Sequence, residues 1–146
     1  MNRSERRVVM VSGKFDPPHE GHIDHIMKAS KLGNFLIVVT QPDEGILAVK
    51  GKVEIPVWAR IALLKGILLY YDIPGEVYVG LDTDGKSVKS LRFFKPEVFA
   101  KGGDRTPQNM PHEEILECNE GGIRLEYGVG DPLNESSKIK LDKEEL

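Results

Sequence analysis

The sequence predicts an α/β protein built on an open parallel sheet of about five strands with helices on both faces. Three observations support this prediction. Short apolar runs rich in β-branched residues alternate along the chain with segments of helical apolar spacing. Glycine and proline residues separate these segments, and regular alternation of strands and helices favours a parallel sheet. A length of 146 residues, 40% of them hydrophobic, fits a single domain over residues 1–146.

The first half of the chain is expected to supply two strands and two helices. Residues 8–11 and 35–40 are nearly continuous apolar runs, which are typical of buried strands. Between them, residues 22–33 place apolar side chains at helical spacing and end in glycine, which predicts a helix. Residues 41–52 contain one proline and two glycines and are expected to form a loop. Residues 56–73 begin with proline, whose missing N–H costs little at a helix start, and are expected to be helical.

The second half continues the alternation. Strands are expected at residues 76–81, 97–100 and 123–127, and helices at residues 87–94, 110–119 and from Ser136. The order βαβαβαβαβ follows, without internal repeats or a linker that divides the chain.

Composition narrows the class of partner. The formal net charge is −3 and no long basic stripe is present, so nucleic acid is not expected as the main partner. No stretch approaches the ~18 apolar residues of a membrane span, and the apolar run after the charged start is too short for a signal peptide. The single cysteine, Cys118, cannot form an internal disulfide, which suits a reducing cytosol. A soluble, cytoplasmic protein without membrane partners is expected.

The stretch GKFDPPHEGH, residues 13–22, joins the first strand to the first helix. In open parallel sheets, ligands bind at the carboxyl ends of the strands. The helix N-terminus that follows offers free N–H groups and a partial positive charge, which suit phosphate. Gly13 and Gly21 leave room for a ligand near the backbone, and His19 and His22 can both donate to one bound anion. The stretch therefore predicts a phosphate site. Zinc is not expected, because the other histidines and Cys118 are scattered along the chain.

The same stretch resembles the HxGH signature of the nucleotidyltransferase superfamily that contains the cytidylyltransferases, G-x-F-D-x-x-H-x-G-H. Every fixed position matches: Gly13, Phe15, Asp16, His19, Gly21 and His22. The resemblance implies a Rossmann-like fold and an enzyme that joins a nucleoside triphosphate to a phosphate-bearing small molecule and releases pyrophosphate. His19 and His22 would be catalytic and the other four would bind the nucleotide.

Three further stretches extend this resemblance over most of the chain. Lys50 and Lys52 stand where the family has a lysine-rich loop, and Arg60 lies in the helix that follows. Residues 99–107, FAKGGDRTP, are similar to a loop of the glycerol-phosphate and heptose-phosphate nucleotidyltransferases, and residues 134–139, NESSKI, are similar to the family's serine/threonine motif. These two stretches contribute the candidate nucleotide-binding residues Lys101, Gly102, Asp104, Asn134, Ser136 and Ser137.

The resemblance implies an in-line attack of the acceptor phosphate on the α-phosphorus, with catalysis by positioning and charge stabilisation. His19 and His22 would donate to the α- and β-phosphate oxygens, and Lys50 or Lys52 would screen the leaving pyrophosphate. The two serines would hold the β- and γ-phosphates, and Arg60 would contact the substrate. Mg²⁺ is expected as cofactor, bound with the nucleoside triphosphate and keeping most of its waters, one of them oriented by Asp16.

Two positions depart from the family pattern. Lys14 stands where the family usually has threonine, serine or cysteine, and it either contacts the triphosphate or points away. Gly130 stands where the cytidylyltransferases carry an arginine before the serine motif. The favoured hypothesis is a cytidylyltransferase that uses CTP and a sugar or polyol phosphate. The alternatives are an adenylyltransferase of the flavin-nucleotide or nicotinate-nucleotide synthetase type, and a nucleotide-binding sensor without turnover.

Several candidates also have plainer interpretations. The two loop lysines can be solvated charges, Asp104 a turn residue, the serines a helix cap and Arg60 a surface charge. His25 is expected to be exposed to solvent rather than to line the pocket. Trp58 and the pair Tyr70 and Tyr71 indicate either core or a subunit contact, and a homodimer is expected because many relatives are dimers.

Overall fold

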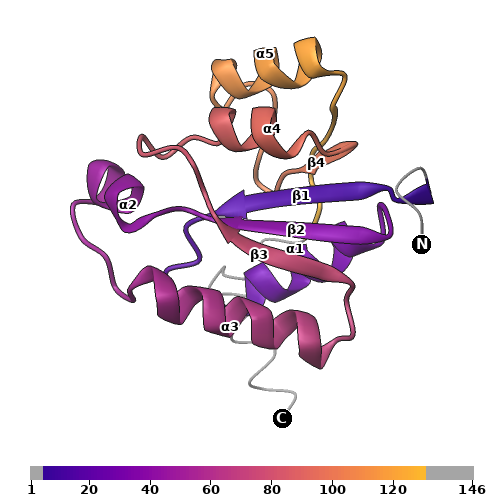
Figure 1. Cartoon of the computed structure of the whole chain (residues 1–146). Helices are drawn as coiled ribbons and strands as arrows, with labels where there is room; N and C mark the ends of the chain where they lie inside the picture. Colours follow the sequence, from indigo (N-terminus) through magenta and orange to yellow (C-terminus); the bar gives the residue numbers. More distant parts are fainter. Residues whose placement is uncertain (1–4, 131–146) are drawn as a thin grey trace.

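The computed structural model describes residues 5–130 and contains five strands and five helices in that range (Figure 1). The strands are β1 (Val8–Gly13), β2 (Phe35–Thr40), β3 (Gly75–Val79), β4 (Val98–Ala100) and β5 (Arg124–Glu126). The helices are α1 (Glu20–Ser30), α2 (Asp43–Lys50), α3 (Val57–Tyr70), α4 (Val88–Phe94) and α5 (His112–Gly121).

All five strands lie in one parallel sheet with the order β3-β2-β1-β4-β5. The chain first builds the sheet outward from β1 through β2 to β3. It then crosses back so that β4 pairs with the free edge of β1. The strand order therefore reverses between β1 and β4, and this is the position at which open parallel sheets bind ligands. The predicted α/β, Rossmann-like open sheet is confirmed.

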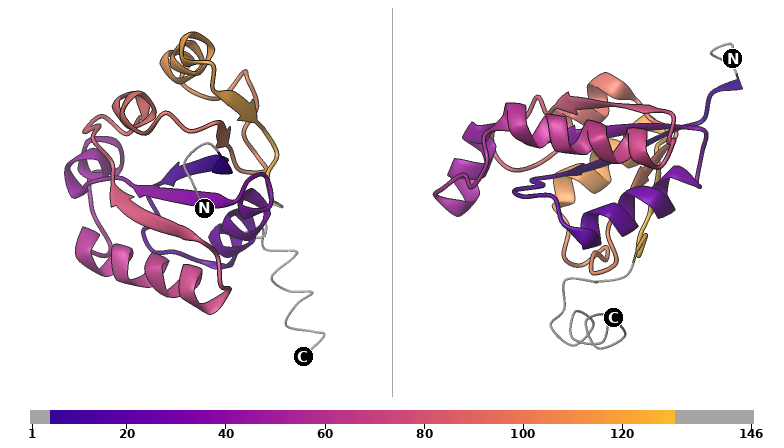
Figure 2. Two further views of the ribbon diagram at one scale, coloured as in Figure 1. Left: turned by 45° about the vertical axis from the view of Figure 1, so that its right-hand side comes forward. Right: turned by 90° about the horizontal axis from the view of Figure 1, so that it is seen from below.

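Helices cover both faces of the sheet. Helices α1 and α3 lie on one face and α4 and α5 on the other, as the views in Figures 1 and 2 agree. Each face has its own hydrophobic core, one centred on buried Val9, Ile26 and Leu64 and the other on Met10 and Phe99. This arrangement follows from the sequence, since adjacent residues of β1 point to opposite faces and both are apolar.

The prediction of a loop over residues 41–52 is wrong, because Asp43–Lys50 forms α2. The three residues that suggested a loop are compatible with this short helix. Pro42 is the N-cap, where its missing N–H is not needed, and Gly51 is the C-cap with φ 80°, a left-handed conformation that suits glycine. Gly45 is buried within the helix. Helix α2 lies beyond the carboxyl ends of β1 and β2 (Figure 1), and so flanks the ligand-binding end of the sheet.

Most other predicted elements agree with the structure to within two or three residues. Helix α1 starts at Glu20 rather than at residue 22, because the His19 side chain caps it. The helix expected from Ser136 lies outside the described residues. Trp58 and Tyr70 are 73% and 80% exposed, so the core interpretation of these aromatic residues is wrong and the subunit contact is left open. Within residues 5–130, no helix is long and apolar enough to cross a membrane.

Candidate active site

A cavity of about 280 Å³ opens where the sheet order reverses. Its walls come from the carboxyl ends of β1 and β4, the first turns of α1 and the segment after β5. The residues that line it are Ser12, Gly13, Phe15, His19, Gly21, His22, His25, Ala100, Lys101, Gly102, Gly103, Asp104, Arg105 and Val129. The cavity therefore brings together most of the HxGH stretch and the KGGD stretch.

His19 and His22 hold each other through a reciprocal cap of α1. The Nδ1 atom of His19 accepts a hydrogen bond from the Gly21 N–H at 3.1 Å, and Nδ1 of His22 accepts from the His19 N–H at 3.1 Å. An imidazole nitrogen that accepts carries no proton, so each neutral ring carries its proton on Nε2. The helix cap thus fixes both rings as Nε2–H donors, which is the tautomer needed to bind an anion.

The two imidazole rings are stacked, with their centroids 3.8 Å apart. His22 also contacts the edge of Phe15, whose ring is 2% exposed. Burial lowers the pKa of His22 to about 4, with smaller contributions from the neighbouring His19 and His25. His22 is therefore a neutral donor at physiological pH.

The amide groups at the start of α1 are partly occupied by the protein itself. The Gly21 N–H donates to the His19 ring, and the His22 N–H donates to the His19 carbonyl at 2.9 Å. The expected role of these amides as direct phosphate ligands is therefore reduced. The Nε2–H groups of His19 and His22, which both line the cavity, are not used by the helix cap. Gly13 packs closely against Phe15 at the cavity wall, because a Cβ there would make a tight contact of 3.3 Å with the Phe15 ring.

Lys101 supplies a buried positive charge to the same cavity. Its side chain is only 11% exposed, and burial lowers its pKa, while Glu114 raises it. The Nζ–Oε1 distance to Glu114 is 3.7 Å, and this carboxylate oxygen has no hydrogen-bond partner among the described residues. The other oxygen of Glu114 accepts from the Ser87 N–H at 3.0 Å, and Ser87 also bonds Ser12 of the cavity wall. Glu114 therefore lies behind Lys101 as its counter-charge.

Further positive charge lies close to Arg105, which is one of the residues that line the cavity. Burial, followed by the charges of Lys50 and Arg105, lowers the pKa of Lys14. Arg105 lines the cavity and was missed by sequence reasoning, although it directly follows the KGGD residues. The backbone of Arg105 is held by a turn, in which its N–H donates to the Gly102 carbonyl at 3.1 Å. Asp104 is the one carboxylate among the described residues that line the cavity, and Gly102 lies beside it.

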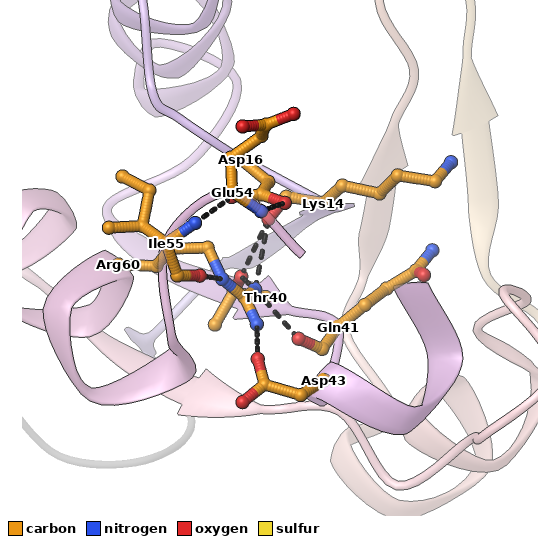
Figure 3. Close-up of polar contacts among 8 residues, drawn as sticks. All are labelled: Lys14, Asp16, Thr40, Gln41, Asp43, Glu54, Ile55 and Arg60. Carbon is orange, nitrogen blue, oxygen red and sulfur yellow. Dashed lines mark hydrogen bonds and ion pairs between the residues drawn. The ribbon is translucent and has the colours of Figure 1, made fainter. Parts of the chain in front are cut away.

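Arg60 is a structural residue in this protein and not an accessible substrate ligand. Its side chain is 0% exposed, and its donors reach protein acceptors, as Figure 3 shows. The acceptors are Ile55 O at 3.0 Å, Lys14 O at 3.0 Å, Thr40 Oγ1 at 2.5 Å, Gln41 O at 2.7 Å and Asp43 Oδ1 at 2.6 Å. The expected substrate contact is therefore corrected: Arg60 ties the end of β2 and the start of α2 to the first residues of the HxGH stretch.

Asp16 has a comparable structural role. Its two carboxylate oxygens accept from the backbone N–H groups of Glu54 and Ile55, at 2.8 and 2.6 Å, and the residue is 9% exposed. The expected position beside a metal-bound water does not fit these contacts. Within residues 5–130, no group of three His, Cys, Asp or Glu side chains is arranged to hold a metal ion.

Lys50 and Lys52 differ in position. Lys50 ends α2 and lies close enough to Lys14 to lower the pKa of that lysine. Lys52 pairs instead with Glu54, with an Nζ–Oε1 distance of 2.9 Å, and both side chains are exposed. Neither lysine is among the described residues that line the cavity. Asn134, Ser136 and Ser137 lie outside the described residues.

His25 lines the cavity, in contrast to the expected exposure to solvent. It lies one turn after His22 on α1, and its Nδ1 atom is 2.6 Å from the carbonyl of Val129. The neighbouring Gly130 has φ 109°, and a Cβ there would lie 3.1 Å from the Cα of His25. An arginine at this position would be strained, which gives a structural reason for the departure from the cytidylyltransferase pattern. The i, i+3 spacing of His22 and His25 was the sequence signal for this placement.

Comparisons with known proteins agree with this geometry. Residues 10–124 match the family described as cytidylyltransferase-like. The chain is 33% identical over 126 residues to the bifunctional protein HldE of Haemophilus ducreyi, and 28% identical over 125 residues to HldE of Desulfatibacillum aliphaticivorans. These matches cover 84% and 86% of this chain but only 25% of either relative, so the chain spans about a quarter of the length of the curated relatives it matches.

Among solved structures, the chain is similar to the lipopolysaccharide core biosynthesis protein from Thermoplasma volcanium GSS1. The TM-score is 0.64 at 26% identity, covering 84% of this chain and 93% of that one. The matched family residues include the HxGH stretch, the KGGD stretch and the whole switch point of the sheet. The chain therefore belongs to the cytidylyltransferase-like family, an enzyme family of nucleotidyltransferases.

Proposed function

We propose that this protein transfers a nucleoside monophosphate from a nucleoside triphosphate to a sugar or polyol phosphate and releases pyrophosphate, with CTP as the favoured donor. The observation that carries the proposal is the pair of Nε2–H groups that His19 and His22 present to the cavity. The likeness to a lipopolysaccharide core biosynthesis protein supports a carbohydrate-derived acceptor.

The proposed chemistry needs little covalent work from the protein. An oxygen of the acceptor phosphate attacks the α-phosphorus in line, a P–O bond forms, and the bond to the β-phosphate oxygen breaks as pyrophosphate leaves. His19 and His22 donate hydrogen bonds to the phosphate oxygens as negative charge moves toward the leaving group. Loss of one preorganised donor of this kind costs roughly 10²–10³ in rate. Lys101, Lys14 and Arg105 stabilise the phosphates electrostatically.

Mg²⁺ is proposed to enter with the triphosphate rather than to be held by a protein cage. Such a cation is bound by the phosphate oxygens and by water, which does not require a cluster of carboxylates. It would neutralise part of the triphosphate charge. Asp104 is the carboxylate among the described lining residues that could contact a water of this cation. The carboxylate of Asp16 instead accepts hydrogen bonds from the backbone of residues 54 and 55.

An adenylyltransferase is the second candidate, and one observation favours it. Gly130 stands in place of the cytidylyltransferase arginine, and its φ of 109° and its close approach to His25 would strain such a side chain. The phosphate contact that the resemblance implies for the cytidylyltransferases is therefore missing from this position or supplied elsewhere, and ATP becomes the competing donor.

The test is release of pyrophosphate from CTP, ATP, GTP and UTP with Mg²⁺ and a panel of sugar and polyol phosphates. Release with CTP and loss of at least 100-fold in His22→Ala would support the favoured proposal, and release with ATP alone would favour the second candidate. His112→Ala is the matched control, because His112 is an exposed histidine at the start of α5 and is not among the described residues that line the cavity. Nucleotide binding without pyrophosphate release in any of these mixtures would refute catalytic turnover and favour a nucleotide-binding sensor.

We propose a homodimer formed through α3. This helix is apolar on most of its circumference, and a helix of that kind is normally buried. Its outward residues include Trp58, Leu69 and Tyr70, which are 73%, 82% and 80% exposed. A second copy related by a two-fold axis would cover both apolar surfaces at once.

A further inference from the structure

We propose that His25 is a specificity-determining residue, whose Nε2 atom accepts a hydrogen bond from a neutral donor group of the bound nucleoside. The proposal rests on the proposed function, since it assumes that the triphosphate occupies the cavity. It assigns to His25 a chemical role opposite to that of His19 and His22.

The tautomer of His25 is set by its protein contact. Nδ1 lies 2.6 Å from the Val129 carbonyl, which can only accept, so Nδ1 carries the proton. The neutral ring then has an unprotonated Nε2. Burial lowers the pKa of His25, which keeps the ring neutral, although the Val129 carbonyl, Asp24 and Asp104 act in the other direction. His19 and His22 have the reverse arrangement, with Nδ1 accepting and Nε2 donating.

The Val129 contact uses Nδ1 and leaves the Nε2 lone pair of His25 without a protein contact in the described part of the chain. His25 is one of the lining residues, and within residues 5–130 no protein group donates to its Nε2. An acceptor is unsuited to a phosphate oxygen, which also accepts. The charge of Lys101 acts on the same imidazole and disfavours a bound cation. A hydroxyl or amino group of the ligand is the remaining type of partner.

The position along α1 indicates which end of the nucleotide reaches His25. His25 follows His22 by three residues, which is about 4.5 Å along the helix axis. A triphosphate bound by His19 and His22 can therefore place its nucleoside beside His25, between Val129 and the Lys101–Gly103 wall. The nucleoside donors are the ribose hydroxyls and the amino group of cytosine or adenine.

Two substitutions separate the pocket role from the contact with Val129. Asn has an amide N–H at nearly the position of Nδ1, so His25→Asn retains a donor to the Val129 carbonyl and loses the Nε2 acceptor. His25→Gln extends an amide oxygen toward the position of Nε2 and loses the donor at Nδ1. His25→Asn is expected to weaken binding of the preferred triphosphate about tenfold, and His25→Gln is expected to retain more of it. Both variants should bind inorganic triphosphate as the wild type does, because the phosphate donors are unchanged.

Analogues then identify the donor on the wild-type protein. Calorimetry with the 2′-deoxy and 3′-deoxy forms of the preferred triphosphate tests the ribose hydroxyls, and replacing its base amino group by a carbonyl oxygen, as UTP does for CTP, tests the base. The analogue that lacks the partner of His25 should bind about tenfold more weakly to the wild type, and His25→Asn should weaken it no further.

Equal binding of all analogues to the wild type, or equal loss of triphosphate and nucleotide binding in His25→Asn, would overturn the role of His25. This result leaves the proposed function intact if the wild type still releases pyrophosphate. A wild-type protein that binds no nucleoside triphosphate would instead refute the proposed function, and the inference with it.

Discussion

Replacement of Arg60 by methionine tests whether the hydrogen bonds of this buried residue stabilise the segments beside the candidate active site. Methionine has a similar length and stays apolar, so the substitution removes the hydrogen bonds with little loss of volume. Four uncharged acceptors lose a partner: the carbonyls of Lys14, Gln41 and Ile55 and the hydroxyl of Thr40. The Nε and Nη1 atoms that reach these acceptors carry three N–H groups, and the Lys14 carbonyl keeps its hydrogen bond from the Thr40 hydroxyl at 3.1 Å. At about 1 kcal/mol net for each of three hydrogen bonds, Arg60 contributes about 3 kcal/mol to the free energy of unfolding.

The ion pair with Asp43 adds little to this figure, because the Asp43 carboxylate is 40% exposed and stays solvated when Arg60 is removed. Relief from burying the guanidinium group offsets part of the loss. We therefore expect Arg60→Met to destabilise the protein by about 2–3 kcal/mol. With a urea m-value of about 2 kcal/mol/M, the midpoint would fall by roughly 1 M.

Equilibrium urea unfolding, followed by circular dichroism, measures this change. Arg92→Met is the matched control, since Arg92 is an exposed arginine paired with Glu117, and little change is expected. Arg60→Lys should restore only part of the stability, because an ammonium cannot span acceptors on four segments. If the urea midpoint of Arg60→Met differs from that of the wild type by less than about 0.5 M, the reasoning is refuted and Arg60 becomes a candidate substrate ligand again.

Three further predictions follow from the same geometry. The pKa of His22 is about 4 in the folded protein against 6.5 in the unfolded chain, so the neutral ring stabilises the fold fully above pH 6.5 and this stabilisation is lost as the pH falls toward 4. The free energy of unfolding, measured with urea, should decline by about 3 kcal/mol over that pH range, and by less in His22→Gln. Glu114→Gln removes the counter-charge of Lys101, so the alkaline limb of the pH–rate profile should move to lower pH, and an unchanged limb would contradict this role. Trp58→Glu should convert a dimer to a monomer in light scattering, whereas a wild type that is already monomeric would rule out the α3 interface.

The fold was predictable because its signals are local and repeated. Each buried strand is an apolar run in the sequence. The alternation of these runs with helices indicates a parallel sheet before any tertiary contact is known. Helix α2 escaped prediction because Pro42 and Gly51 are as common in loops as they are at helix ends. The burial of Ile46, which is 0% exposed, anchors the eight-residue helix between them in the protein, and a local sequence pattern does not report this burial.

Members of the candidate site could be predicted where residue type alone decides the chemistry, but not where the direction in which a side chain points decides it. His19, His22 and Lys101 were identified by their motifs, and the structure places all three at one cavity. Arg60 and Asp16 belong to equally suggestive patterns, but their charged groups face backbone atoms of the protein. A sequence gives the charge of a side chain but not the number of protein acceptors or donors that already occupy it.

His19 at the N-cap of α1, and His22 and His25 within it, show how backbone contacts give one residue type two hydrogen-bonding roles. Rings at positions 19 and 22 accept backbone N–H groups at Nδ1 and so become donors at Nε2, which suits phosphate oxygens. The ring at position 25 meets a carbonyl at Nδ1 and so becomes an acceptor at Nε2. That carbonyl belongs to Val129, 104 residues away, and no local pattern in the helix predicts it. The free ring nitrogens therefore change along α1 from hydrogen-bond donors at His19 and His22 to an acceptor at His25, because different backbone groups meet each ring. The proposed partners are a phosphate for the first two rings and a nucleoside donor group for the third.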